Sequence, residues 1–239
     1  MTDPRITMLA RNLVNYSVKA GKGDKVLIEA FETDTQIVTE LVKAVYAAGA
    51  QPFVELRNSK VQRALLMGGD DAYFKNLCKY DIYRMQDMDC YIGVRGAHNS
   101  FETSDVPSDK TEKYSVLYSH PVHHDTRVCK TRWVVLRYPN DSMAQLAGTS
   151  TESFEDFYFD VCNLDYSKMD KAMDALKNLM DKTDKVRIVA RDTDLSFSIK
   201  GIGAIKCAGE MNIPDGEVYT APVRDSVNGV IHYNAPSIE

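Results

Sequence analysis

The sequence has few cysteines, no excess of basic residues and no long uninterrupted apolar run. Its five cysteines form no C-x-x-C pair, which argues against a disulfide framework and against a thiolate zinc site. Lys and Arg number 29 against 34 for Asp and Glu, so the charge balance does not favour nucleic acid or an anionic membrane. No segment has the length of a transmembrane helix or the apolar core of a signal peptide. We therefore expect a cytoplasmic protein with free thiols and with neither nucleic acid nor membrane as a partner.

Several catalytic signatures are missing as well. The chain contains no G-x-x-x-x-G-K-[ST] phosphate loop, no G-x-S-x-G elbow and no H-E-x-x-H helix, so the enzyme classes that these motifs mark have no support. Gly21 and Gly23 precede the first apolar run instead of following it, which is the wrong order for a dinucleotide-binding fingerprint.

Strands and helices alternate along most of the chain. Short apolar runs predict strands, and apolar residues at helical spacing predict helices between them. The strands are expected at 25–30, 52–56, 89–94 and 132–138, and helices at 5–18, 34–48, 70–88, 143–146, 154–161 and 169–180. A strand, a capped helix, a glycine and a second strand in succession are typical of a right-handed crossover. We predict an amino-terminal α/β domain over residues 1–185, with an open, mainly parallel sheet and flanking helices.

The pattern changes to alternation from about Lys185. The runs at 186–190 and 194–199 are separated by Arg-Asp-Thr, which predicts an antiparallel hairpin. A turn is expected at 211–216, and a further strand pair about Asn228 and Gly229. We interpret residues 186–239 as the beginning of a second, mostly antiparallel domain.

Three histidines lie close together in a helical stretch, at His120, His123 and His124. Spacings of three and four residues put two imidazoles on one helical face, as a zinc site requires. Because Pro121 weakens that geometry and Asp125 is the only adjacent carboxylate, we favour solvated surface histidines over a metal site. Cys90, in a predicted strand without a base beside it, is interpreted as a buried inert thiol and not as a nucleophile.

Pro214, Asp215 and Gly216 predict a turn that presents Glu217 at the first position of a strand. A carboxylate held rigidly at a sheet edge is able to ligate a divalent metal. By spacing alone, an ordinary exposed turn glutamate is the simpler interpretation.

The segment N-I-P-D-G-E-V-Y-T-A-P at 212–222, followed by D-S-V-N-G at 225–229, resembles the leading metal-ligand motif of the aminopeptidase T, aminopeptidase S and PepS family of dinuclear metallo-aminopeptidases. L-R-Y-P at 136–139, M-A-Q-L-A-G at 143–148 and D-T-D-L-S-F-S-I at 192–199 are also similar to this family. The resemblance implies a catalytic domain that binds two divalent metal ions, zinc, cobalt or magnesium/manganese, and it assigns Glu217 as one metal ligand.

The remaining glutamate, histidine and aspartate ligands of that family lie downstream of this motif, beyond Glu239, and neither His232 nor Asp225 matches one of them. The resemblance therefore implies that this chain is an amino-terminal fragment of a cytoplasmic aminopeptidase that releases amino-terminal residues from peptides and is a homodimer when full length. The general base is also expected beyond Glu239, so no catalytic residue is assigned. We expect the fragment alone to be inactive and to hold no metal stably.

Two other interpretations remain. One is a non-catalytic α/β module that binds a small ligand at the sheet crevice near His98, Asn99 and Ser100. The other is a structural domain used for dimerisation. Arg224 and Asp225 are either pocket neighbours or a solvated turn pair, and we favour the solvated pair.

Overall fold

The computed structural model describes residues 3–235, which form two compact units. Unit 1 consists of the described residues up to Leu164 together with Gly209–Pro214, and unit 2 consists of Asp165–Ala208 together with the described residues from Asp215 onward. Within residues 3–235, no helix is both long and apolar enough to cross a bilayer. The division into domains at residue 185 stays a prediction.

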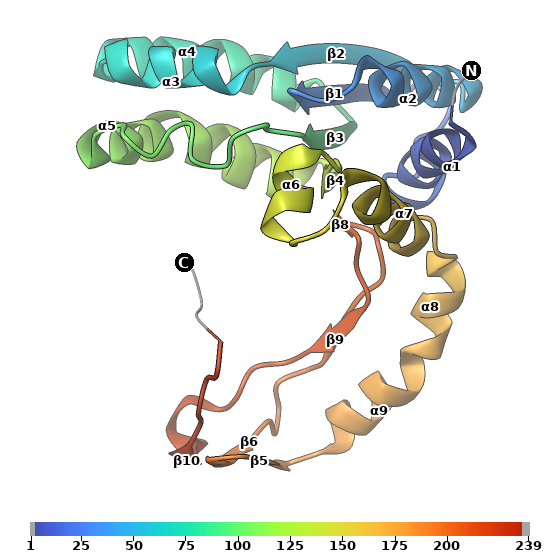
Figure 1. The fold of residues 1–239 in the computed structure, drawn as a ribbon, viewed down its shortest axis with the longest axis vertical. Helices are drawn as coiled ribbons and strands as arrows, with labels where there is room; N and C mark the ends of the chain where they lie inside the picture. Colours follow the sequence, from blue (N-terminus) through green and yellow to red (C-terminus); the bar gives the residue numbers. More distant parts are fainter. Residues whose placement is uncertain (1–2, 236–239) are drawn as a thin grey trace. The chain divides into compact units, whose positions relative to one another are not determined.

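Unit 1 is built on a sheet of five parallel strands in the order β2-β1-β3-β4-β8 (Figure 1). The strands are β1 (Lys25–Phe31), β2 (Gln51–Arg57), β3 (Cys90–Arg95), β4 (Arg132–Arg137) and β8 (Asn212–Ile213). Nearly all residues of β1 and β3 are buried, as is usual for the central strands of parallel sheets that are covered by helices. The predicted α/β class and open parallel sheet are confirmed.

Strand β8 comes from a stretch that the sequence predicts to be part of a turn. Asn212 and Ile213 pair in parallel with Val135 and Leu136 of β4, and Ile213 is buried. The turn begins only at Pro214, so the prediction of a turn over residues 211–216 is wrong in its first half. Pairing with a strand far away in the sequence, and not local alternation, makes these two residues a strand.

Helices connect the strands of unit 1 and carry the end caps that their sequences indicate. They are α1 (Pro4–Asn12) with the π-helix η1 (Leu13–Ser17), α2 (Thr35–Ala47), α3 (Ser59–Gly68), α4 (Asp71–Gln86), α5 (Ser108–Tyr114) with the π-helix η2 (Ser115–Val128), α6 (Asp141–Leu146) and α7 (Thr151–Cys162). The Asp3 carboxylate caps α1 by accepting the backbone N–H of Arg5, and Asp34 caps α2 by accepting that of Gln36. Helix α3 lies in a segment for which no helix or strand is predicted from the sequence.

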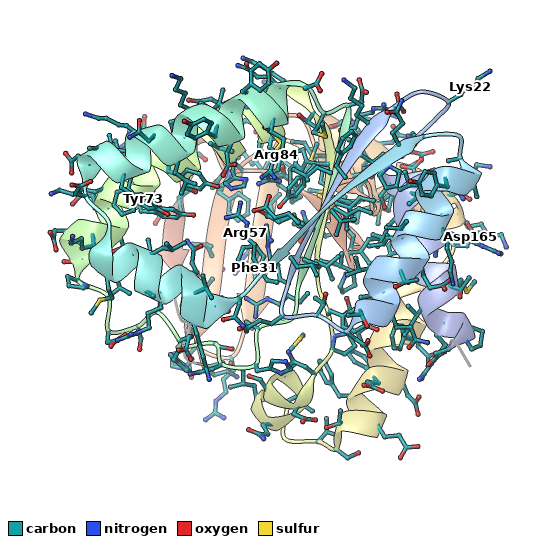
Figure 2. All side chains as sticks on the ribbon, turned by 90° about the horizontal axis from the view of Figure 1, so that it is seen from above. Lys22, Phe31, Arg57, Tyr73, Arg84 and Asp165 are labelled. Carbon is teal, nitrogen blue, oxygen red and sulfur yellow. The ribbon has the colours of Figure 1, made fainter. Side chains whose placement is uncertain are left out.

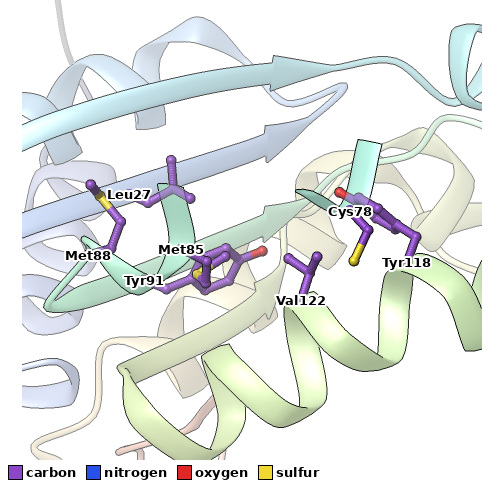
Figure 3. Packing of buried hydrophobic residues seen from close by; sticks show 7 residues of the cluster. All are labelled: Leu27, Cys78, Met85, Met88, Tyr91, Tyr118 and Val122. Atoms are coloured by element: carbon purple, nitrogen blue, oxygen red, sulfur yellow. The ribbon is translucent and has the colours of Figure 1, made fainter. Parts of the chain in front are cut away.

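The core of unit 1 packs α4 and η2 against β1 and β3, as Figure 3 shows. Its buried members are Leu27, Cys78, Met85, Met88, Tyr91, Tyr118 and Val122. Tyr91 and Tyr118 are fully buried, and fully burying a large apolar side chain stabilises a fold by about 1.5–3 kcal/mol. Trp133 of β4 packs against the same cluster.

A charged network lies inside unit 1 near this core. The Glu29 carboxylate forms ion pairs with Arg57 Nε at 2.8 Å and Arg95 Nη1 at 2.9 Å, and it accepts a hydrogen bond from Tyr91 Oη. Both guanidinium groups also lie over the ring of Phe31, and Figure 2 labels Arg57 and Phe31 beside each other. Glu29 is only 2% exposed, so its charge depends on these partners.

Cys90 lies at the start of β3 and is fully buried, with Sγ 3.6 Å from the carbonyl oxygen of Val18. Burial raises the pKa of this thiol to about 11, which confirms a buried thiol that resists ionisation.

Cys129 is exposed. Alkylation followed by mass spectrometry should therefore modify Cys129 readily and Cys90 only after denaturant is added. Labelling of both at similar rates in the folded protein would contradict this expectation, and Cys129→Ser identifies the fast-reacting site.

Unit 2 contains two helices and two small antiparallel sheets. Its helices are α8 (Tyr166–Ala172) and α9 (Asp174–Lys182), with a short 3-10 turn, η3 (Arg224–Ser226). One sheet has the order β10-β6-β5 and the other pairs β7 with β9, where the strands are β5 (Lys185–Ala190), β6 (Thr193–Ser198), β7 (Ile205–Cys207), β9 (Glu217–Tyr219) and β10 (Asn228–Val230). The predicted hairpin is confirmed, because β5 and β6 are antiparallel and joined by a two-residue turn.

The strand pair predicted about Asn228 and Gly229 is wrong. These residues form the single strand β10, which pairs with β6. Gly229 has a φ of +122°, and a Cβ on it would lie 2.1 Å from the carbonyl oxygen of Asp194. The glycine is therefore needed for close approach to the neighbouring strand, and not for a hairpin turn.

Candidate metal-ligand site

Glu217 is the first residue of β9, as the sequence predicts. Strand β9 pairs with β7 in antiparallel register, with Cys207 opposite Glu217. The backbone of Glu217 is held by this ladder while its side chain is exposed. Its position at the start of a strand is confirmed, and its role as a metal ligand stays a prediction.

The turn before Glu217 is packed against α8 within unit 2. The backbone N–H of Asp215 donates to Tyr166 Oη at 3.2 Å, and Tyr166 is buried. Gly216 has a φ of +138°, and a Cβ on it would come 3.2 Å from Met169 Sδ. A side chain at position 216 would therefore be strained and crowded, and the glycine lets the chain enter β9 along this path.

Lys206 is the nearest cation along β7, and it is already neutralised by other groups. Its Nζ lies 2.6 Å from Asp170 Oδ1 and 2.7 Å from Asp174 Oδ1, and these hydrogen bonds raise the pKa of Lys206. Among residues 3–235, no cation forms an ion pair with Glu217. The Glu217 carboxylate thus keeps its oxygens available for another positive partner.

A dinuclear metal centre needs several ligands for each ion, since one carboxylate neither fills the coordination sphere nor balances the charge. Within the described part of the chain, His120, His124 and Asp125 are the one group of three or more ligand side chains that converge, and they lie in unit 1. Glu217 fits as a single oxygen ligand. The described residues do not complete a dinuclear site around it, so we derive no chemical step from them.

The structure separates the three histidines of η2. His123 points inward, with its ring centroid 6.4 Å from that of Tyr91 and 6.0 Å from that of Tyr118. Burial lowers the pKa of His123 to about 4, so it is neutral near pH 7. His120 and His124 are exposed. The predicted surface exposure is therefore right for these two and wrong for His123, because helical spacing alone does not show which face is buried. Their exposure does not test the preference for solvated histidines over a metal site.

Two cavities lie at the carboxyl ends of β1, β3 and β4, where the strand order of the sheet reverses. The larger has a volume of about 610 Å³, and its lining includes Glu32, His98 and Asn140. The smaller, about 300 Å³, is lined in part by Asn99 and Ser100. The residues proposed from the sequence for a small-ligand crevice thus line cavities, but that alternative does not account for the motif at Glu217.

The remaining candidate residues of unit 2 are exposed. Arg224 and Asp225 lie in η3 with exposed side chains, in keeping with a solvated turn pair. His232 is exposed, and its backbone N–H donates to Thr193 Oγ1 at 2.8 Å.

Comparison with known proteins decides the family. A sequence model of the family described as thermophilic metalloprotease (M29) matches residues 2–239. This chain belongs to the M29 family. The match extends over residues 212–222, so the resemblance to this metalloprotease family is confirmed, while the role of Glu217 as a metal ligand stays a prediction.

Two solved structures show the same fold as this M29 chain. Wild-type AmpT from Thermus thermophilus has a TM-score of 0.72 and 18% identity, over 95% of this chain and 63% of that chain. The 2,5-dihydroxypyridine dioxygenase from Pseudomonas putida KT2440 has a TM-score of 0.52 and 12% identity, over 94% of this chain and 57% of that chain. This chain thus spans less than two thirds of either structure. No curated protein was found to match it.

Proposed function

We propose that the polypeptide to which this M29 chain belongs is a metal-dependent aminopeptidase, in which Glu217 is one ligand of a pair of divalent metal ions. The observation that carries the proposal is the motif at 212–222 within a metalloprotease family, with its glutamate held at the start of β9 and exposed. The resemblance of that motif supports removal of amino-terminal residues from peptides as the reaction.

A carboxylate oxygen is a ligand that zinc, cobalt, magnesium and manganese all accept. When bound, such ions polarise a scissile carbonyl and lower the pKa of a bound water. This chain supplies the fixed position of the carboxylate, through the turn against α8 and the pairing of β9 with β7. Glu217 acts as a ligand and not as the general base.

Residues 1–239 by themselves should hydrolyse no peptide and hold no metal stably at Glu217, because the described residues supply one matched ligand. We also propose that the complete enzyme is a cytoplasmic homodimer. The five free cysteines support a reducing compartment, and the family resemblance supports the dimer, which sedimentation velocity tests.

The test compares the whole polypeptide that the gene encodes with residues 1–239. Each is incubated with an unblocked peptide and with the same peptide acetylated at its amino terminus. We expect the whole polypeptide to release amino-terminal residues from the unblocked peptide only, to lose this activity with a chelator and to regain it with zinc or cobalt. Equal cleavage of the acetylated peptide, or activity that survives complete metal removal, would contradict the proposal. Hydrolysis by residues 1–239 alone would contradict the expected ligand count.

A further inference from the structure

The exposed face of η2 gathers three metal-ligating side chains in unit 1. His120 Nδ1 lies 3.3 Å from Asp125 Oδ2, and His124 Nδ1 lies 3.1 Å from Asp125 Oδ1. The two imidazole rings are stacked with centroids 4.5 Å apart. One ligand atom from each of the three residues lies within 4.8 Å of the others.

The π-helical geometry of η2 brings these residues together. In an α-helix, residues three and four apart share a face, and a residue five positions on points elsewhere. Hydrogen bonds from i to i+5 in a π-helix instead place residue i+5 close above residue i. His120 therefore has both His124 and Asp125 on its side of η2, while His123 faces the core. Irregular helices of this kind are frequent at functional sites.

The distances suit a small metal ion. Zinc lies about 2.0–2.2 Å from nitrogen and oxygen ligands in a tetrahedral site, so neighbouring ligand atoms are about 3.3 Å apart. The two nitrogen-to-oxygen distances, 3.3 and 3.1 Å, are close to such an edge, and they run to the two different oxygens of Asp125. One ligand atom of each residue lies within 4.8 Å of the others, so the side chains have to move closer together around an ion. The three side chains are 57–60% exposed, so a small rotation of one imidazole needs no change in the core, and a fourth position stays open to water.

We propose that His120, His124 and Asp125 form a binding site for one divalent transition-metal ion of the zinc, cobalt or nickel type. Two imidazoles and one carboxylate favour these ions over magnesium and calcium, which prefer oxygen ligands alone. The ion would link successive turns of η2. None of these residues belongs to the motif that presents Glu217, so the site stands whether or not Glu217 is a ligand.

The test is calorimetric titration of untagged residues 1–239 with Zn²⁺, in a chain that also carries Glu217→Ala. We expect one ion per chain in that background. His120→Asn and His124→Asn should each weaken binding by about tenfold or more, since even groups that only support a metal ligand contribute this much. His98→Asn and His232→Asn alter exposed histidines outside the cluster and should leave the affinity unchanged.

A second measurement separates loss of the site from loss of the fold. Co²⁺ should give a visible absorption band in the Glu217→Ala chain that is absent from the His120→Asn/His124→Asn double variant, with identical far-UV circular dichroism. Unchanged Zn²⁺ affinity in the double variant would overturn the proposal, as would an equal loss of affinity in His98→Asn.

Discussion

Replacing Glu217 by alanine in the whole polypeptide should reduce the metal-dependent release of amino-terminal residues by at least about 100-fold, because groups that only support a ligand already cost 10–100-fold when removed. The change removes the exposed carboxylate and leaves the β9 backbone paired with β7. Bound metal, measured by inductively coupled plasma mass spectrometry, should fall together with the activity.

Glu217→Gln sharpens this prediction, because it keeps the size of the side chain and removes its charge. It should lose activity almost as fully as the alanine variant, whereas Glu217→Asp should keep a fraction of it. The matched control is Glu112→Ala, which removes an exposed glutamate from α5 in unit 1 and should leave the rate and the metal content unchanged. Undiminished hydrolysis by Glu217→Ala would refute the ligand assignment.

Glu29→Leu should destabilise unit 1 by about 3–5 kcal/mol, since removing one partner of a buried ion pair leaves the other charge uncompensated. The charge left without its partner is chiefly that of Arg57, whose side chain is 14% exposed. Urea unfolding followed by tryptophan fluorescence measures this effect in unit 1 alone, because Trp133 of β4 is the one tryptophan of the chain. Asp105→Asn breaks the exposed pair with Arg63 and should barely move the midpoint.

The network around Glu29 also predicts that the stability of unit 1 depends on pH. Burial alone would raise the pKa of Glu29, but Arg95 and Arg57 outweigh it and hold the pKa below its usual value of 4.5. The ionised carboxylate therefore stabilises the folded state above that value, and this contribution is lost as the pH falls through the lower, folded-state pKa. Between pH 6 and pH 3, unit 1 of the Glu29→Gln variant should lose less free energy of unfolding than unit 1 of the unmodified protein, as measured by urea unfolding at each pH. If replacing Glu29 changed the free energy of unfolding as little as Asp105→Asn does, a stabilising role of Glu29 would be contradicted.

Local patterns in the sequence predict the strands of six or seven residues well and the strands of two or three residues poorly. β1 follows from a short apolar run, and α2 from apolar spacing after the Asp34 cap. β8 has two residues and owes its existence to Val135 and Leu136 of a distant strand, which no local pattern encodes. The Asn-Gly pair in β10 resembles a hairpin turn, yet Gly229 serves a close approach to Asp194.

Sequence reasoning places Glu217 correctly, because a proline and a glycine fix the turn that precedes it. It raises His120, His123 and His124 as a possible metal site and sets that site aside. α-helical spacing groups His120 with both His123 and His124 and leaves Asp125 on another face. Pro121 cannot donate to the helical ladder, and the π-helix turns His123 to the core and Asp125 outward. A proline within a histidine-rich helix is the signal that this spacing needed revision.

The polypeptide passes between the two units three times, after Leu164, after Ala208 and after Pro214. A single stop codon therefore cannot yield an intact unit 1 that is free of unit 2, because a product that ends at residue 164 lacks β8 and leaves the edge of β4 open to other strands, and one that ends at residue 214 retains residues 165–208. To produce unit 1 alone, residues 165–208 are removed and a short linker is placed before Gly209, so that the edge strand β8 is retained.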